Sequence, residues 1–413
     1  GKGVGQDANQ FADEYPYSFI SARNVRIAGG DGEIAAINAN DGSKLWTASV
    51  EGRAYGLSIA GGRLFVNTDQ GLTYCFGLQQ VDHAAIVAIE TSPFRFANEK
   101  QAAKQVTKAQ RILTESNVQK GYCLVLNSGD GSLAYELARQ SELSVVAVEA
   151  DIQRVNESRA AIGAAGFYGA QVVVHHLPSA DALPYTDYVF NLVVDAAAGG
   201  GAGVDVASVD RAEVLRVLRP GTGIAWLGKA GGTAGDSDNS VIRRPKLDRT
   251  GEWSHMYADV SNTSCSTDER VKGPMAMQWF GKPGPREMLN RHHRTVAPLW
   301  KNGRLFIPGN DQIFAADAYN GTLLWNVKLP ESRRIAAFRD CSYMSASDDH
   351  LFAVAGDECH VLNAQTGYAE HVFQVPQKSD RTNSDWGYVA NVKNLLVGSG
   401  CRTGASRREH TRD

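Results

Sequence analysis

The sequence has little net charge, no long apolar run and no closely spaced cysteines. Its 413 residues carry 42 basic and 45 acidic side chains, a formal net charge of −3. Such a balance gives no electrostatic reason to expect nucleic acid or an anionic membrane surface as a partner. No apolar run approaches the roughly 20 residues that a membrane-spanning helix needs. The sequence therefore predicts a globular protein with no nucleic-acid partner and no membrane span.

Cysteines are few and widely spaced. The six cysteines form no C-x-x-C pair and no adjacent pair, which excludes zinc-ribbon, haem-attachment and thioredoxin-type sites. We therefore assign no metal site. The even count permits disulfide bonds, and the spacing leaves their pairing open.

An internal repeat joins two distant parts of the chain. Residues 34–46 read IAAINANDGSKLW and residues 313–325 read IFAADAYNGTLLW. A weaker third copy has Ala364 and Gly367 at the matching places, with His371 where the tryptophan stands in the other copies. Alternating apolar residues, a glycine turn and a Leu-Trp strand predict a β-hairpin in each copy.

These repeats resemble the quinoprotein (PQQ-type) β-propeller repeat over roughly residues 20–86 and 250–400. The resemblance implies four-stranded blades that close into a ring, one of whose faces could bind a protein or a small molecule. It also makes pyrroloquinoline quinone (PQQ) a possible cofactor, although no site residues in the sequence support it. We expect blades in residues 1–90 and 251–413.

Between the two repeat regions the apolar period changes. Residues 123–149 read as a strand, a glycine-rich turn, a helix and a second strand that ends in an acidic residue, and the alternation continues to residue 230. Such alternation predicts a parallel sheet with helices on both faces over residues 97–230. A Gly/Ser/Asp-rich stretch suggests a linker over residues 231–250. The expected fold is multidomain: a β-propeller interrupted by an α/β Rossmann-like doubly wound domain.

The inserted segment resembles the S-adenosylmethionine-dependent methyltransferases. The motifs that carry this resemblance are the glycine-rich turn, the carboxylate after the second strand, FNLV at 190–193 and LRPG at 218–221. The resemblance implies S-adenosylmethionine as cofactor and a set of cofactor-binding residues. These are Asn127, Gly129, Asp130, Gly131, Glu149, Ser179, Asp181 and Asn191.

The insert also departs from the family pattern. Asn127 and Asn191 stand where the family has acids, and Leu133 replaces a third glycine. Glu149 remains as the carboxylate that could accept ribose hydroxyls, while Gly129 and Gly131 let the backbone approach the cofactor. We name no catalytic residue, because methyl transfer needs mainly alignment of the reacting atoms.

Three functions stay open at this point. The first is S-adenosylmethionine-dependent methyl transfer to an unknown acceptor. The second is a non-catalytic propeller scaffold that carries a degenerate methyltransferase-like insert, and the third is a PQQ-dependent oxidoreductase. The propeller type suggests the bacterial periplasm. The chain begins without Met and stops without a closing element, so we expect a piece of a longer protein that lacks its targeting signal.

Overall fold

A computed structural model of the chain describes residues 14–78, 91–179, 182–197, 210–227, 240–281, 283–284, 287–288, 297–332, 343–376 and 384–403. The chain divides into two compact units, residues 1–88 and 89–413, and each is described by itself below. No helix in the described ranges is long and apolar enough to cross a membrane.

The first unit is an antiparallel sheet of six strands in sequence order. Its strands are β1 (Ser18–Ala22), β2 (Val25–Gly29), β3 (Asp31–Asn38), β4 (Lys44–Ala60), β5 (Arg63–Thr68) and β6 (Thr73–Phe76). One face packs around fully buried Ile34, Ala54 and Val66. Strand β4 is 17 residues long, and it pairs with β3 along its first part and with β5 along its second.

The second unit begins with an α/β domain, whose sheet has the order β12-β11-β10-β7-β8-β9. Its strands are β7 (Lys120–Leu126), β8 (Glu142–Glu149), β9 (Val172–His176), β10 (Leu192–Asp195), β11 (Ile224–Leu227) and β12 (Ser240–Arg243). All are parallel except β12, which pairs antiparallel with β11. Residues 240–243 of the expected linker are therefore the last strand of this sheet.

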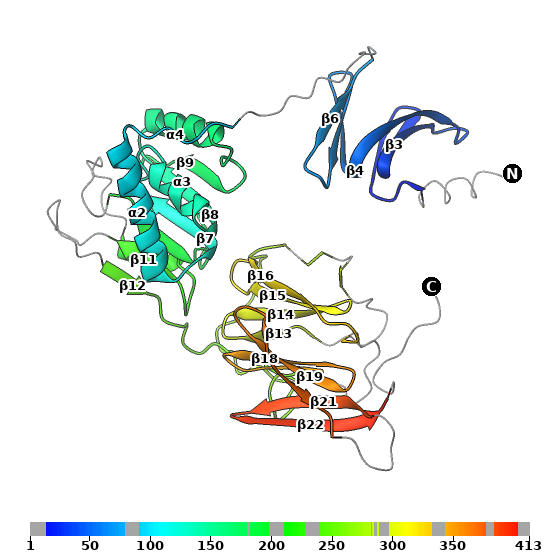
Figure 1. Ribbon diagram of the computed structural model, residues 1–413, viewed down its shortest axis with the longest axis vertical. Helices are drawn as coiled ribbons and strands as arrows, with labels where there is room; N and C mark the ends of the chain where they lie inside the picture. Colours follow the sequence, from blue (N-terminus) through cyan, green and yellow to red (C-terminus); the bar gives the residue numbers. More distant parts are fainter. Residues whose placement is uncertain are drawn as a thin grey trace. The chain divides into compact units, whose positions relative to one another are not determined.

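Helices cover both faces of this sheet, as the alternating pattern predicts (Figure 1). They are α2 (Glu99–Ser116), α3 (Ser132–Arg139), α4 (Ile152–Ala164) and α5 (Arg211–Val217). Successive residues of β7 point to opposite faces. Cys123 and Val125 pack in the core with α2, α3 and α4, and Leu124 and Leu126 pack in the core with α5.

Helices α2 and α4 begin where short polar side chains cap them. Asn98 accepts from the backbone N–H of Gln101 at the start of α2, and Asp151 accepts from that of Gln153 at the start of α4. Such caps satisfy backbone donors that the first helical turn leaves unpaired. The cap on α4 matters for the site below, because it directly follows Glu149.

The C-terminal part of the second unit consists of antiparallel sheets. One has strands β13 (Leu299–Lys301), β14 (Arg304–Gly309), β15 (Gln312–Asp317) and β16 (Leu323–Lys328), and the next has β17 (Met344–Ala346), β18 (His350–Ala355), β19 (Glu358–Asn363) and β20 (Ala369–Gln374). A pair follows, β21 (Ser384–Val392) and β22 (Leu395–Arg402). Within the described ranges these are two complete four-stranded blades and part of another, and they form no closed ring.

The predicted repeat hairpins are present in all three copies. Trp46 pairs with Ala36, Trp325 with Ala315, and His371 with Val361. In each copy the register shifts directly after that pair. The turn glycine has a φ of 75°, 73° and 76° in the three copies, a conformation that glycine adopts without steric cost.

Trp325 joins two successive blades through one of these turns. The indole N–H of Trp325 donates to the backbone oxygen of Ala364 at 3.1 Å, and a Cβ on Gly367 would lie 2.7 Å from the indole. Trp279, which lies outside the described strands, contacts the turn of the second copy in the same way: its indole N–H donates to the backbone oxygen of Ala318 at 2.9 Å. For Trp325, the repeat supplies both the tryptophan and the small residues on which it packs.

Candidate functional site

A cavity of about 330 Å³ lies at the carboxyl ends of the parallel strands of the α/β domain. It is bounded by the residues that follow β7 and β10, by the end of β8, and by α2, α4 and the start of α3. Its walls are formed by Gln101, Gln105, Asn127, Ser128, Gly129, Asp130, Ser132, Leu133, Glu149, Arg154, Glu157, Ala196 and Ala197. The chain order switches between β7 and β10, which is where open α/β sheets generally bind ligands.

Asn127 directly follows β7 and contacts the end of β10. Its φ of 52° places it in the left-handed region, which asparagine tolerates better than most residues. Its Nδ2 donates to Oδ1 of Asp195 at 2.9 Å. The acid that the family pattern places on the first strand is therefore absent, but a carboxylate from the fourth parallel strand of the chain lies beside Asn127.

Glu149 holds the glycine-rich turn together. Its Oε2 accepts from the backbone N–H of Gly129 at 2.8 Å, and its Oε1 accepts from the N–H groups of Ala150 and Asp151 at 3.0 and 3.1 Å. Glu149 is only 5% exposed. Since an ionised carboxylate has about four acceptor sites, these three bonds leave room for about one more donor, not for two.

Asp130 is also bound to its own neighbours. Its Oδ1 accepts from the backbone N–H of Ser132 at 3.1 Å and from the Ser132 hydroxyl at 2.6 Å. Its Oδ2 accepts from Nε2 of Gln101 at 2.6 Å. Helix α2 is thus linked directly to the turn that begins α3.

The two glycines of the turn have different roles. Gly129 has a φ of 58°, and a Cβ built on it would meet nothing within 4 Å, so its space is open to a ligand. Gly131 has a φ of 78°, and a Cβ there would lie 2.9 Å from Cδ1 of Ile162 and 3.1 Å from Cβ of Ser158. Gly131 is not among the residues that line the cavity, and its lack of a side chain serves the packing of α4 on the turn.

Leu133 leaves the cavity open. It stands where the family pattern has a third glycine, and its side chain lies in the wall, only 2% exposed. It packs in the core together with Val155 and Ile162 of α4. The replacement of glycine by leucine therefore fills the space under α4 and does not fill the cavity.

Two buried polar atoms in the cavity wall have no hydrogen-bond partner among the described residues. They are Oγ of Ser128 and Oε1 of Gln105. Ser128 is only 4% exposed, and its backbone is fixed at both ends by bonds to Val148 and Gly131. Buried polar groups are normally paired, so two unpaired ones in one cavity point to a missing bonding partner.

The charge around the cavity is predominantly negative. Its wall contains the side chains of Asp130, Glu149 and Glu157 and one basic side chain, Arg154. Next to it, Nζ of Lys108 donates to the backbone oxygen of Ala196 at 2.7 Å. Burial lowers the pKa of Lys108 to about 8, an effect that Asp195 partly opposes.

Asn191 lies at the amino-terminal ends of the parallel strands, opposite the cavity, so its assignment to the cofactor site is wrong. These ends are called the amino edge of the sheet below, and the ends that face the cavity are called the carboxyl edge. It precedes β10, and its Oδ1 accepts from the backbone N–H of Tyr122 at 3.0 Å. Its Nδ2 donates to Asp317 of the first C-terminal blade at 3.1 Å. The residue of β10 that reaches the cavity edge is Asp195, because side chains of parallel strands gather near a ligand only at the carboxyl ends.

Two predicted residues remain, Ser179 and Asp181. Ser179 follows β9 and does not line the wall. Asp181 lies outside the described residues. The structure therefore places Asn127, Gly129, Asp130 and Glu149 together in one wall.

The amino edge of the sheet is a contact with the first C-terminal blade. Nε of Arg219 is 2.5 Å from Oδ2 of Asp317, and the two residues are 4% and 2% exposed. The same guanidinium donates to the backbone oxygen of Gly303 at 2.9 Å, and Nδ2 of Asn320 donates to the backbone oxygen of Val189 at 2.8 Å. Arg219 belongs to the LRPG motif of the sequence, so this motif serves the contact between domain and blade.

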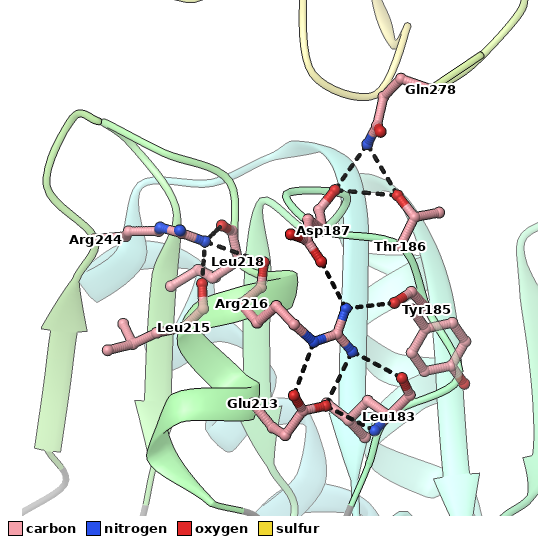
Figure 2. A network of polar contacts seen from close by, with 10 residues as sticks. All are labelled: Leu183, Tyr185, Thr186, Asp187, Glu213, Leu215, Arg216, Leu218, Arg244 and Gln278. Atoms are coloured by element: carbon pink, nitrogen blue, oxygen red, sulfur yellow. Dashed lines mark hydrogen bonds and ion pairs between the residues drawn. The ribbon is translucent and has the colours of Figure 1, made fainter. Parts of the chain in front are cut away.

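A second polar network is centred on Arg216 of α5, and Figure 2 shows it. Arg216 donates to Glu213, to Asp187 and to the backbone oxygens of Tyr185 and Leu183. Hydrogen bonding from Arg216 lowers the pKa of Glu213 to about 2. Gln278 reaches this network through Nε2, which donates to the backbone oxygen of Asp187 at 2.7 Å.

Sequence reasoning missed several residues that line the cavity or lie beside it. Gln101, Gln105 and Lys108 come from a helix that precedes the first strand of the sheet, where no family motif stands. Asp195 could have been found from its place at the end of an apolar strand. Arg154 could have been found as the basic residue one turn into the helix after Glu149.

A larger cavity of about 1280 Å³ lies among the C-terminal blades. His255 lies in its wall, only 4% exposed, and its Nε2 accepts from the backbone N–H of Asn391 at 3.3 Å. Burial lowers the pKa of His255. Because Nε2 accepts a hydrogen bond, the ring proton lies on Nδ1, which faces the Ser254 hydroxyl. Within the described ranges, no group of three or more His, Cys, Asp or Glu side chains could hold a metal ion.

Comparison with known families separates the insert from its flanks. A family model described as outer membrane protein assembly factor BamB matches residues 18–88 and 270–403, on both sides of the α/β domain. The flanks carry PQQ-type repeats. No curated protein matches the chain.

Solved structures match about a third of this chain. A methyltransferase from Aquifex aeolicus that depends on S-adenosylmethionine is 15% identical, with 34% of this chain and 80% of that chain covered and a TM-score of 0.25. A Methanococcus maripaludis protein assigned to the same enzyme class is 22% identical, with 33% and 66% covered and a TM-score of 0.26. The [4+2]-cyclase SpnF is 23% identical, with 35% and 54% covered and a TM-score of 0.27. The chain thus spans 66% of the Methanococcus protein and 54% of the cyclase.

Proposed function

We propose that the α/β domain binds S-adenosylmethionine and transfers its methyl group to an acceptor still to be identified, and that PQQ-type repeats carry this domain as a scaffold. The observation that carries the proposal is the open cavity at the carboxyl edge, lined by Asn127, Gly129, Asp130 and Glu149. Its volume of about 330 Å³ lies within the range of small-molecule sites, about 300–1,000 Å³. The cofactor supplies a sulfonium-bound methyl group, and the chain supplies position and charge.

The hydrogen bonds already made by the backbone N–H groups of the glycine-rich turn argue against a phosphate ligand. In nucleotide-binding turns, free backbone N–H groups receive the phosphate oxygens. Here the N–H groups of Gly129 and Ser132 already donate to Glu149 and Asp130. A dinucleotide would have to displace these bonds and bring its diphosphate beside two carboxylates. A ligand without phosphate meets neither obstacle.

The charge of the cavity favours a cation. Three acidic side chains and one basic side chain line it, so a ligand with net positive charge gains Coulomb energy there. S-adenosylmethionine has this property, because its sulfonium and ammonium charges exceed its one carboxylate charge. Glu149 has room for one more hydrogen bond, which a ribose hydroxyl would supply.

Ligand binding without methyl transfer is the second candidate. It is favoured by the pairing of Asn127 with Asp195, because this bond ties the turn to the strand end from which an acceptor would approach. In that case the chain is a scaffold with a recognition module. Transfer of a labelled methyl group to protein or small-molecule acceptors distinguishes the two candidates.

Calorimetric titration of the full chain tests the proposal. We expect heat of binding with S-adenosylmethionine and none with NAD⁺ at the same concentration. Gly129→Val should abolish the heat, because the added side chain lies at the cavity. Gly169→Val is the matched control, since Gly169 also has a positive φ and open space around its Cβ but does not line the cavity. Equal binding of NAD⁺, or no binding of S-adenosylmethionine, would overturn the proposal.

A further inference from the structure

The cavity of about 1280 Å³ among the C-terminal blades has one face of the β17–β20 sheet in its wall. Phe352 of β18, Val361 of β19 and His371 of β20 line it and are neighbours in the register of that sheet. Phe373 lies two residues further along β20 and is 41% exposed. Its ring makes a T-shaped contact with that of His371, with centroids 4.3 Å apart. The cavity therefore offers an aromatic surface to a ligand.

The same face of the preceding blade is covered by protein. Its row consists of Phe306, Ala315 and Trp325. All three are at most 7% exposed, and Trp325 packs on the turn at residues 364–367 of the next blade. A peptide segment is therefore the kind of group that covers this face where the chain itself supplies one.

The repeat sequence changes at the cavity. The first and second copies have Leu-Trp at the end of the repeat, and the third copy has Glu370-His371 at the same two positions. An apolar pair is thus replaced by a carboxylate and an imidazole. This replacement points to a polar group in the ligand, beyond apolar packing.

Glu370 is held at both of its carboxylate oxygens. Oε1 accepts from Nδ2 of Asn363 at 2.8 Å, and Oε2 accepts from Nε2 of His350 at 2.9 Å. These hydrogen bonds lower the pKa of Glu370, so the side chain is ionised at neutral pH. Because a carboxylate has about four acceptor sites, about two remain, and the side chain is 44% exposed. Glu370 is therefore a fixed anion that can accept two more N–H groups.

The wall of the cavity carries more acidic than basic side chains. These are Asp259, Asp348, Asp349 and Glu370 against Lys301 and Lys393. Lys301 is already paired with Glu252 and, at 3.3 Å, with Asp348. A cation therefore gains Coulomb energy in the cavity, whereas an anion loses it. Among the cations of proteins, the guanidinium group is planar, stacks on aromatic rings and donates to a carboxylate through two N–H groups.

We infer that this cavity binds a peptide segment that carries an arginine side chain, with the guanidinium held between the Glu370 carboxylate and the ring of Phe373. The rest of the segment lies on Phe352 and Val361, whose equivalents in the preceding blade are buried. This inference is independent of the function proposed for the α/β domain.

Two peptides of nearly equal shape test the inference. Acetyl-Ala-Arg-Ala-amide carries the guanidinium, and the same peptide with citrulline in place of arginine carries a neutral urea group. The dissociation constant of each is measured by calorimetry on the full chain. We expect the arginine peptide to bind about tenfold more tightly, as expected for hydrogen bonds to a charged group, and to bind more weakly as salt is added. Equal binding of the two peptides, or binding of neither, would overturn the inference.

Single substitutions locate the guanidinium. Glu370→Gln should weaken binding of the arginine peptide about tenfold and leave the citrulline peptide unchanged. Phe373→Val introduces the residue of the preceding blade, Val327, and should weaken the arginine peptide about fivefold through loss of the cation–π contact. Asp357→Asn is the matched control, because it removes one negative charge from an exposed residue of the same blade that does not line the cavity. It should bind both peptides as the wild type does.

A double substitution separates loss of the site from loss of the fold. Glu370→Leu combined with His371→Trp restores the Leu-Trp pair of the other two copies, so the free energy of unfolding should not fall. The preference for the arginine peptide should disappear. If Glu370→Gln or this double variant keeps the preference of the wild type, the guanidinium binds elsewhere and the inference is overturned.

Discussion

The two edges of the α/β sheet differ in how their polar groups are paired. At the amino edge, Arg219, Asn191 and Asp317 are bound to one another or to backbone groups on both sides of the contact with the blade. At the carboxyl edge, Ser128 and Gln105 each leave a buried oxygen without a described partner. One edge therefore stabilises the fold, and the other keeps polar atoms available for a ligand.

The blade residue at this contact shows how the repeat was adapted. Asp317 occupies a repeat position that is Asn38 in the first copy and Asn363 in the third. In all three copies this side chain accepts from a backbone N–H two residues later. Only the copy that meets the α/β domain has the carboxylate, and there it faces a buried arginine. The negative charge of Asp317 stabilises the contact with Arg219. The turn itself needs only the side-chain oxygen that asparagine and aspartate share.

Asp317→Asn should have the largest effect on stability. The substitution keeps the turn acceptor of the other copies but leaves Arg219 buried without its counter-charge. Breaking a buried pair in this way costs about 3–5 kcal/mol. Denaturant unfolding measures the free energy of unfolding of the full chain, and binding of S-adenosylmethionine to the folded variant should persist.

An exposed ion pair is the control for Asp317→Asn. Arg53 and Asp31 are 3.3 Å apart with side chains 47% and 65% exposed, so Asp31→Asn should change stability little. If Asp317→Asn has no larger effect than Asp31→Asn, the amino edge does not stabilise the domain in the way described here.

Lys108 provides a pH-dependent test of the carboxyl edge. Its pKa is lowered from 10.5 to about 8 in the folded protein by burial. Between these values the unfolded chain binds more protons, so stability rises with pH over this interval. Relative to Lys108→Met, the free energy of unfolding of the wild type should therefore increase by up to about 3 kcal/mol from pH 7 to pH 10.5.

Denaturant unfolding at several pH values measures this difference, and Lys104→Met, at an exposed neighbour on the same helix, is the control. A difference between wild type and Lys108→Met that does not change with pH would show that the ammonium group is well solvated. Such a result would mean that burying the Lys108 ammonium group at this edge costs no free energy of folding.

The two glycines of the turn, Gly129 and Gly131, allow packing and an open ligand space to be compared within the carboxyl edge. Gly131→Ala should cost about 2–3 kcal/mol, because its Cβ meets Ile162 and Ser158 in addition to the backbone strain. Gly129→Ala should cost only about 1–2 kcal/mol, the strain of its positive φ. Thermal or denaturant unfolding measures both, and equal losses would contradict the separate roles of the two glycines.

Much of the fold could be predicted from the sequence. The apolar alternation gives most elements of the α/β sheet, and the Asn-Gly and Asp-Gly turns give the repeat hairpins. Strand β12 was missed, because its four residues SVIR follow a Gly/Ser/Asp-rich stretch and carry no long apolar pattern. It becomes a strand by pairing with β11, which local sequence does not indicate.

The site was less predictable than the fold. Residues close to strand ends in the sequence, such as Gly129 and Glu149, follow from the motif. Asn191 was misplaced, because a motif match does not say which end of a strand a residue occupies. Gln105 reaches the cavity only because α2 packs against α3, a tertiary contact with no local signal.

Hydrogen–deuterium exchange with and without saturating S-adenosylmethionine tests the central comparison most directly. The account predicts added protection in peptides that cover residues 127–133, 149–154 and the first half of α2. Peptides that cover the amino edge, around Asn191, Arg219 and Asp317, should already be protected and should not change. Protection that appears at the amino edge instead, or at neither edge, would contradict the account.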